Sequence, residues 1–191
     1  MKSTIATLVA LLITSAAAAA DDPDTGIPID KIIASVAHKT SHKFVIDPRV
    51  NARVNLVGED ISQVTYSELL SILEVYGFVT AQSGGYVLVL PDANARQTAQ
   101  PQLVHGQTYP DAQIVNYTIP VQNGPAAFLV PILRPLLPQY AHLAAAVCSN
   151  TLLITDRYAN VKRIEAIVKT LDVGTPYKPE KCESPAKRND S

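Results

Sequence analysis

The sequence predicts an α+β protein made of two small domains, and three observations support this fold class. Apolar residues recur with a helical period in four segments, and short β-type runs lie between these segments. A polar stretch with several glutamine, asparagine and proline residues separates two groups of such segments at residues 91–112. After the first 20 positions about 170 residues remain, which is enough for two small domains.

Residues 1–20 have the pattern of a cleaved secretory signal. Lys2 precedes an apolar run, an alanine tract follows from Ala16 to Ala20, and Asp21 begins polar sequence. A membrane anchor would need about 20 strongly apolar residues, so the small-residue tract favours cleavage. The net charge is −1 and no comparable apolar run follows. We expect a soluble exported protein with no transmembrane segment after cleavage and no nucleic-acid partner.

The first domain is expected at residues 21–90, with the element order α-β-β-α-β-β. Asp30 is the expected N-cap of its first helix, which should end near His42. No strand is expected before this helix, because the preceding residues contain two prolines and a glycine. Two β-type runs follow at residues 43–46 and 53–57.

The second helix of this domain has the best local signal in the chain. Thr65 and Glu68 have the spacing of a capping box, and Gly77 supplies a left-handed stop. Strands are expected at residues 78–82 and 86–90, because the glycine pair between them permits a tight hairpin.

The second domain is expected at residues 113–174, with the order β-α-β-β-α. Its first strand is residues 114–120, and Asn123 or Gly124 should cap the helix that follows. Two prolines, at positions 131 and 135, should kink or segment this helix.

A hairpin and a last helix complete the second domain. The hairpin strands are residues 142–148 and 151–155, and the helix ends before Gly174. The apolar face of this helix contains Val161, Ile164, Ile167, Val168 and Leu171. The polar residues 175–191 have the composition of a disordered tail.

The chain has two cysteines, Cys148 and Cys182. In an oxidising compartment they predict a disulfide that would pin the tail to the second domain. A buried free thiol at Cys148 is the alternative.

Enzymatic and metal chemistry are not expected. His38 and His42 have the spacing of two metal ligands on one helical face, but no third ligand accompanies them. Cys148 lacks a matched histidine, and Ser149 beside His142 is interpreted as turn chemistry. We therefore predict no catalytic, metal or cofactor site.

Six aromatic and basic residues have a structural and a functional interpretation. Tyr66, Tyr76, Phe78 and Tyr86 could form a binding stripe, but their positions favour core packing. Arg134 and Arg157 are interpreted as surface charges at helix ends.

Longer segments resemble a known family. The first domain contains FVIDPRVNARVNL at residues 44–56, LEVYGF at 73–78 and SGGYVLVLPDANAR at 83–96. The second contains LRPLL and SNTLLITDR within residues 116–172. These segments resemble the first two N-terminal domains of the type II secretion secretin, an outer-membrane channel. The resemblance implies a secretin/TonB short N-terminal type domain followed by a KH-like ring domain.

The resemblance implies a periplasmic protein-interaction module that binds secretin ring subunits or an inner-membrane component of the secretion machine. Without the β-domain that drives ring assembly in the family, we expect a monomer or a weak oligomer. We expect no pore, because 191 residues cannot supply that domain. The alternatives are a signalling module like that of outer-membrane receptors, and a truncated secretin gene product.

Overall fold

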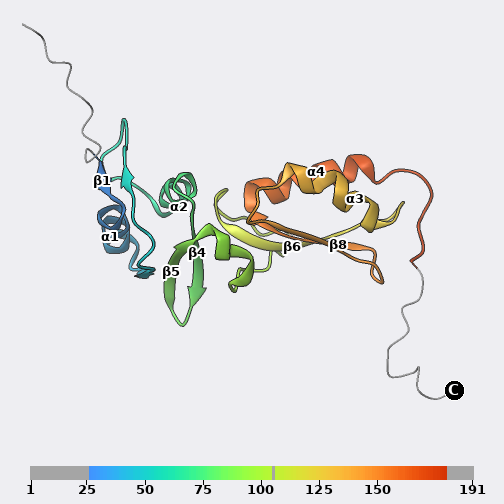
Figure 1. The fold of residues 1–191 in the computed structure, drawn as a ribbon, viewed down its shortest axis with the longest axis horizontal. Helices are drawn as coiled ribbons and strands as arrows, with labels where there is room; N and C mark the ends of the chain where they lie inside the picture. Colours follow the sequence, from blue (N-terminus) through green and yellow to red (C-terminus); the bar gives the residue numbers. More distant parts are fainter. Residues whose placement is uncertain (1–25, 105, 180–191) are drawn as a thin grey trace, which may run out of the picture.

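The structure is a computed structural model that describes residues 26–104 and 106–179. The expected signal at residues 1–20 and residues 180–191 of the expected tail lie outside these ranges. Figure 1 shows two α+β units side by side, which we call the N-terminal unit and the C-terminal unit. Each unit packs its helices against a three-stranded sheet.

The N-terminal unit contains five strands and two helices in the order β1 (Ile27–Pro28), α1 (Ile29–Thr40), β2 (Lys43–Ile46), β3 (Arg53–Val54), α2 (Tyr66–Val75), β4 (Phe78–Ser83) and β5 (Tyr86–Pro91). The sheet has the order β2-β5-β4, with β2 parallel and β4 antiparallel to β5. Strands β1 and β3 form a separate antiparallel ribbon. Helices α1 and α2 bury Ile32, Ile33, Val36, Leu69 and Leu73 in one core.

Two expectations at the start of this unit were wrong. A short strand, β1, precedes the first helix, because Ile27 pairs with Val54 of β3. Asp30 is not the N-cap: α1 begins at Ile29, and Pro28 occupies the cap position without a side-chain hydrogen bond. The Ile29 backbone N–H instead donates to Ala52 O at 3.0 Å. The ribbon therefore holds the start of the helix in place of a cap.

The local signals predicted for the second helix and for the hairpin that follows it are confirmed. Thr65 Oγ1 accepts a hydrogen bond from Glu68 N, and Glu68 Oε2 accepts one from Thr65 N, which completes the capping box. Gly84 and Gly85 both have positive φ angles, of 55° and 82°, in the turn between β4 and β5. Both features depend only on neighbouring residues.

The stretch expected as a linker, residues 91–112, is partly packed in its described residues 91–104 and 106–112. The 3-10 helix η1 (Asp92–Gln97) follows β5 directly, and its Ala95 is only 1% exposed. Further along, the Asn116 N–H donates to Pro101 O and the Leu103 N–H to Asn116 O, so this segment adds to the edge of β6. Composition alone missed this packing because its partners lie in both units.

The C-terminal unit has the order β6 (Ile114–Pro120), α3 (Ala126–Leu133), the 3-10 helix η2 (Arg134–Leu136), β7 (His142–Ala146), β8 (Thr151–Arg157) and α4 (Tyr158–Leu171). The sheet is antiparallel, in the order β6-β8-β7. Both α-helices cover the same face of this sheet (Figure 1). The prolines at positions 131 and 135 lie in α3 and η2, so the predicted segmentation is observed.

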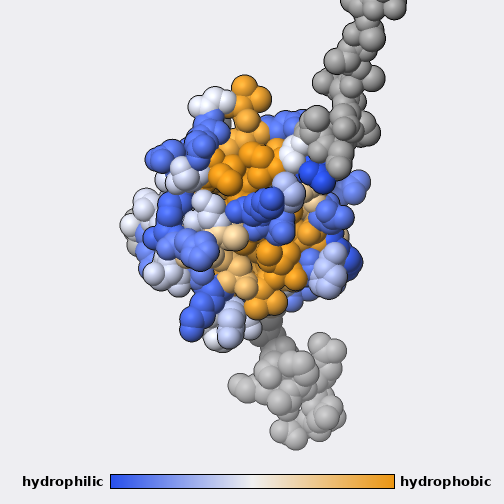
Figure 2. Space-filling view, turned by 90° about the vertical axis from the view of Figure 1, so that its left-hand side faces the viewer, coloured by the Kyte–Doolittle hydropathy of each residue, from blue (hydrophilic) through white to orange (hydrophobic). Residues whose placement is uncertain are grey.

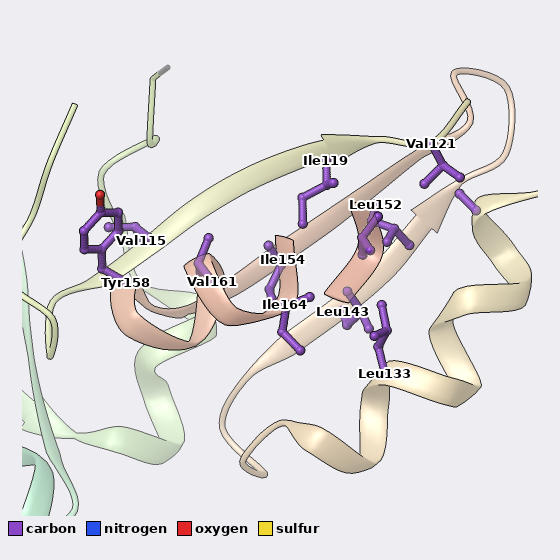
Figure 3. Close-up of a cluster of buried hydrophobic side chains, with 12 residues drawn as sticks. Val115, Ile119, Val121, Leu133, Leu143, Leu152, Ile154, Tyr158, Val161 and Ile164 are labelled. Carbon is purple, nitrogen blue, oxygen red and sulfur yellow. The ribbon is translucent and has the colours of Figure 1, made fainter. Parts of the chain in front are cut away.

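The core of this unit lies between β8 and the two helices. Figure 3 shows Ile154 of β8 beside Val161 and Ile164 of α4, and Leu143 of β7 close to Leu133 at the end of α3. One expected core position is wrong, because Leu171 is 41% exposed at the end of α4.

The start of α3 is held by Asn150, from the turn between β7 and β8. The sequence favoured Asn123 or Gly124 as the cap, but Pro125 occupies the cap position. Asn150 Oδ1 accepts from Ala126 N at 2.7 Å, and Asn150 Nδ2 donates to Val121 O and Gly124 O at 2.6 and 2.9 Å. Its side chain is 5% exposed and its φ is 49°. Asn150 therefore ties the hairpin turn to the β6–α3 connection.

We predict that Asn150→Ala lowers the free energy of unfolding by about 2–4 kcal/mol, because it leaves buried backbone groups unpaired and places a Cβ residue without a polar side chain at positive φ. Urea unfolding would measure the loss. Asn150→Gly keeps the φ preference and should still lose most of this stability. Ser149→Ala, at the exposed neighbouring position of the same turn, is the matched control. Equal stability of Asn150→Ala and Ser149→Ala would contradict this role.

Candidate protein-interaction site

The two units meet at a joint built around Arg157, the last residue of β8. Its side chain is 3% exposed. Nη1 donates to Ala112 O at 3.0 Å, and Nε donates to Tyr140 Oη at 2.8 Å. Nε also lies 3.0 Å from Oε1 of Glu74, which belongs to α2 of the N-terminal unit. One guanidinium therefore contacts both units and the segment between them.

An apolar seam lies beside this charged contact. Val79 of β4, Ala95 of η1 and Ile114 of β6 are each buried to at least 98%, and Leu90 and Tyr140 pack against them. The Tyr140 ring also lies under the guanidinium, with Arg157 Cζ 5.3 Å from the ring centroid. The seam contains residues of both units. Its Tyr140 ring covers part of the Arg157 side chain and helps to exclude water from it.

The interpretation of Arg157 as a surface charge was wrong. Arg157 is buried, and a buried cation must be paired and hydrogen-bonded to be tolerated. Arg134 is partly buried, and its Nη1 donates to Pro138 O and Ala141 O at 3.3 and 3.0 Å. It thereby holds the loop that places Tyr140 against Arg157. No sequence signal identifies these contacts, since their partners are distant in the chain.

We predict that Arg157→Met lowers the free energy of unfolding by about 3 kcal/mol, because Tyr140 Oη and Ala112 O lose their buried donor. Glu74→Gln should cost less than about 1 kcal/mol, since the Glu74 side chain is 45% exposed. Urea unfolding of each variant would measure these losses. The control is Arg49→Met, which removes an arginine that is 64% exposed. A loss for Arg157→Met no larger than that for Arg49→Met would contradict the joint.

Asp156 adds a second buried charge next to this joint. It is fully buried, and its Oδ1 accepts a hydrogen bond from Arg157 N at 2.7 Å. Its Oδ2 has no hydrogen-bond partner among the described residues. Burial raises the pKa of Asp156 above 3.8, while the Arg157 N–H, Asn160 and the Arg157 and Arg163 charges oppose this rise. Burial likewise raises the pKa of Tyr140 to about 12, so its hydroxyl stays protonated at neutral pH.

The raised pKa predicts a pH-dependent stability. Because folded Asp156 holds its proton more tightly than unfolded Asp156, its contribution to stability falls as the pH rises from 3.8 through the folded pKa. In Asp156→Asn this fall is absent. We expect the stability of the variant, relative to the native protein, to increase with pH across this window and then level off. Thermal unfolding at a series of pH values would test this, and a constant or decreasing difference would contradict it.

The end of the N-terminal unit that lies away from the joint is the best exposed surface for a partner. It carries the β1–β3 ribbon and α1, and Figure 2 shows apolar side chains gathered on this end with polar side chains around them. Val57, shortly after β3, is 91% exposed, and Val45 of the edge strand β2 is 48% exposed. A Cβ on Gly26 would lie 2.9 Å from Arg53 Cβ, so the ribbon requires glycine here.

The structure divides the four aromatic residues. Phe78 is buried, while Tyr66 and Tyr76 are partly buried against the same core, as expected. Tyr86 is 45% exposed, so its expected core position is wrong. The Tyr66 ring stacks on the ring of His42, with 4.9 Å between the centroids.

The residues considered for metal, catalytic and disulfide chemistry can be placed only where they fall within the described ranges. Among residues 26–104 and 106–179, no group of three or more His, Cys, Asp or Glu side chains could hold a metal ion. His142 begins β7, whereas Ser149 lies in the turn beyond the other end of this strand. Cys148 is disulfide-bonded, but Cys182 lies outside the described residues, so their pairing stays a prediction.

Comparison with known proteins decides the family. A model of the GspD-like N0 domain matches residues 25–89. A model of the bacterial type II/III secretion system short domain matches residues 116–176. The chain belongs to the secretin family of the type II secretion system. Its N-terminal and C-terminal units are thus mixed α+β secretin N-terminal domains, a class of structural components.

Secretin relatives match along most of this chain. Secretin XcpQ of Pseudomonas aeruginosa is 37% identical over 147 residues, which are 75% of this chain and 21% of that protein. Secretin ExeD of Aeromonas hydrophila is 31% identical over 151 residues, which are 75% of this chain and 22% of that protein. The chain therefore spans about a fifth of the length of the curated relatives it matches.

A solved secretin assembly also matches. The Klebsiella pneumoniae type II secretion system outer membrane complex, with PulD, PulS and the PulC HR domain, contains a chain that is 29% identical, with a TM-score of 0.62. The match covers 77% of this chain and 26% of that chain. Within the part of the chain that the structure describes, every helix is too short or too polar to cross a membrane.

Proposed function

We propose that this secretin-family chain is a non-enzymatic protein-interaction module of a type II secretion system that works in the periplasm. The observation that carries the proposal is the joint around Arg157, which gives two small units one fixed arrangement and leaves the β1–β3 end exposed. A module that transmits contact between partners needs both properties. The family and the matched outer membrane complex support a role in a type II secretion system.

The proposed partner of the exposed end is an inner-membrane component of the secretion machine. The matched Klebsiella complex contains the HR domain of PulC together with its secretin. In this chain, the ribbon and the edge strand β2 offer backbone groups, and Val45 and Val57 offer exposed apolar surface. Backbone pairing with alternate apolar contacts is a common way to bind an extended segment. Secretin ring subunits are the second proposed class of partner.

We propose residues 21–90 and 113–174 as the two domains, with residues 91–112 between them. The packing of each unit around its own core supports this division. The order β-α-β-β-α with both helices on one face supports a KH-like fold for the second domain.

The proposal predicts that Val57→Asp weakens capture of the secretion-machine partner at least tenfold, or about 1.4 kcal/mol, because a charge would enter an apolar contact. The chain would be purified from the periplasm of an expression host, and its affinity for the separately purified periplasmic region of the partner measured. Val173→Asp is the matched control, since Val173 is also exposed but belongs to the other unit.

Equal binding by Val57→Asp, Val173→Asp and the native chain would place the contact elsewhere. Capture of a membrane-bound regulator in place of a secretion component would support the receptor-like signalling module. Loss of binding in both variants would show that the exposed end has no specific role.

A further inference from the structure

An open cleft of about 490 Å³ lies beside the joint and is lined from both sides of it. One part of the lining is the 3-10 helix η1, which continues from β5 and contributes Asp92, Ala93 and Arg96. The other part is the loop before β7 in the C-terminal unit, which contributes residues 138–140. Small molecules bind preferentially between domains, in clefts of about 300–1,000 Å³. This cleft has both the place and the size of such a site.

Two opposite charges line this cleft, and the protein compensates neither of them. Within the described part of the chain, neither the Asp92 carboxylate nor the Arg96 guanidinium has a hydrogen-bond or ion-pair partner. The two residues are four positions apart in η1. Because a 3-10 helix has three residues per turn, side chains at this spacing point about 120° apart and do not meet. The short helix therefore holds the two charges apart within one cleft.

Contacts of the joint fix both parts of the lining. The Asp92 N–H donates to Gly77 O at 2.9 Å, and Ala95 of the same helix is buried in the apolar seam. In the loop, Tyr140 Oη accepts a hydrogen bond from Arg157 Nε at 2.8 Å. These contacts give the cleft a fixed shape, which lowers the ordering cost of binding a ligand.

The rest of the lining adds one neutral polar group and some apolar surface. The Gln139 carboxamide has no hydrogen-bond partner among residues 26–104 and 106–179. It can both donate and accept, as a backbone peptide group does. Ala93, Pro138 and the Tyr140 ring supply apolar surface. The lining thus combines a carboxylate, a guanidinium, an amide and an apolar wall.

We propose that this cleft binds a short peptide of two or three residues with free termini. The α-ammonium group of the peptide pairs with the Asp92 carboxylate. Its α-carboxylate pairs with the Arg96 guanidinium, which can hold a carboxylate through two parallel hydrogen bonds. Gln139 binds the peptide group between these ends, and a small side chain packs on the Tyr140 ring. A free amino acid fits less well, because its two charged groups are adjacent while η1 holds its charges apart.

A peptide in this cleft adds a contact across the joint, because its binding groups come from η1 and from the loop of the C-terminal unit. A ligand that binds only the folded protein raises its apparent stability as the ligand concentration increases. Binding of the peptide therefore strengthens the arrangement of the two units.

Amide chemical shifts of the nitrogen-15-labelled chain, purified from the periplasm of an expression host, test the proposal with the dipeptide Ala-Ala. We expect saturable shifts at residues 92–96 and 139–140, with a Kd of about 1–10 mM. N-acetyl-Ala-Ala and Ala-Ala amide each lack one terminal charge, and each should bind at least tenfold more weakly. Equal binding of the three compounds, or no saturable shift at these residues with Ala-Ala, would overturn the proposal.

Charge-removing variants test the protein side of the same contacts. Asp92→Asn and Arg96→Gln should each raise the Kd for Ala-Ala at least tenfold. The matched controls, Glu59→Gln and Arg49→Gln, remove the same charges at exposed positions outside the cleft and should leave the Kd unchanged.

The variants and the blocked peptides together assign each charge to its partner. In Asp92→Asn, acetylation of the peptide should have no further effect, whereas amidation should still weaken binding. In Arg96→Gln, the reverse should hold. Independent, additive losses would overturn the assignment, as would equal losses in the control variants. The peptide series on the native chain decides the proposal even if a variant fails to fold.

Discussion

The Arg157 guanidinium is the contact on which the arrangement of the two units depends, because it is bound at once by Glu74, Tyr140 and the backbone of Ala112. These partners come from α2, from the loop before β7 and from the segment that joins the units. Burying this cation is favourable only while its hydrogen bonds are made. Of these contacts, the one to Glu74 crosses between the units, so rotation of one unit against the other would break it and would open the apolar seam of Val79, Ala95 and Ile114.

This constraint explains why residues 92–103 pack against both units although their composition is polar. Ala95 fills the apolar seam of the joint, and the residues around Pro101 cover the edge of β6. The segment thus acts as part of both units. Its order also fixes the separation between the β1–β3 end and the C-terminal unit (Figure 1), as a module that connects partners requires.

The sequence identified the features that depend on neighbouring residues. The capping box at Thr65 and Glu68 and the hairpin glycines Gly84 and Gly85 each act within a few positions, so their spacing was sufficient. The roles of Asn150 and Arg157 depend on contacts with distant parts of the chain. A turn asparagine and a charged strand end look the same in sequence whether they are exposed or buried. The family resemblance indicated a type II secretion system, but it did not indicate these contacts.

The central claim is that the two units form one rigid body, and residual dipolar couplings of backbone amides measure this most directly. If the joint holds, couplings from residues of the N-terminal sheet and of the C-terminal sheet fit one alignment tensor in the orientation of Figure 1. Two tensors of different magnitude would show units that reorient independently. That result would contradict the account.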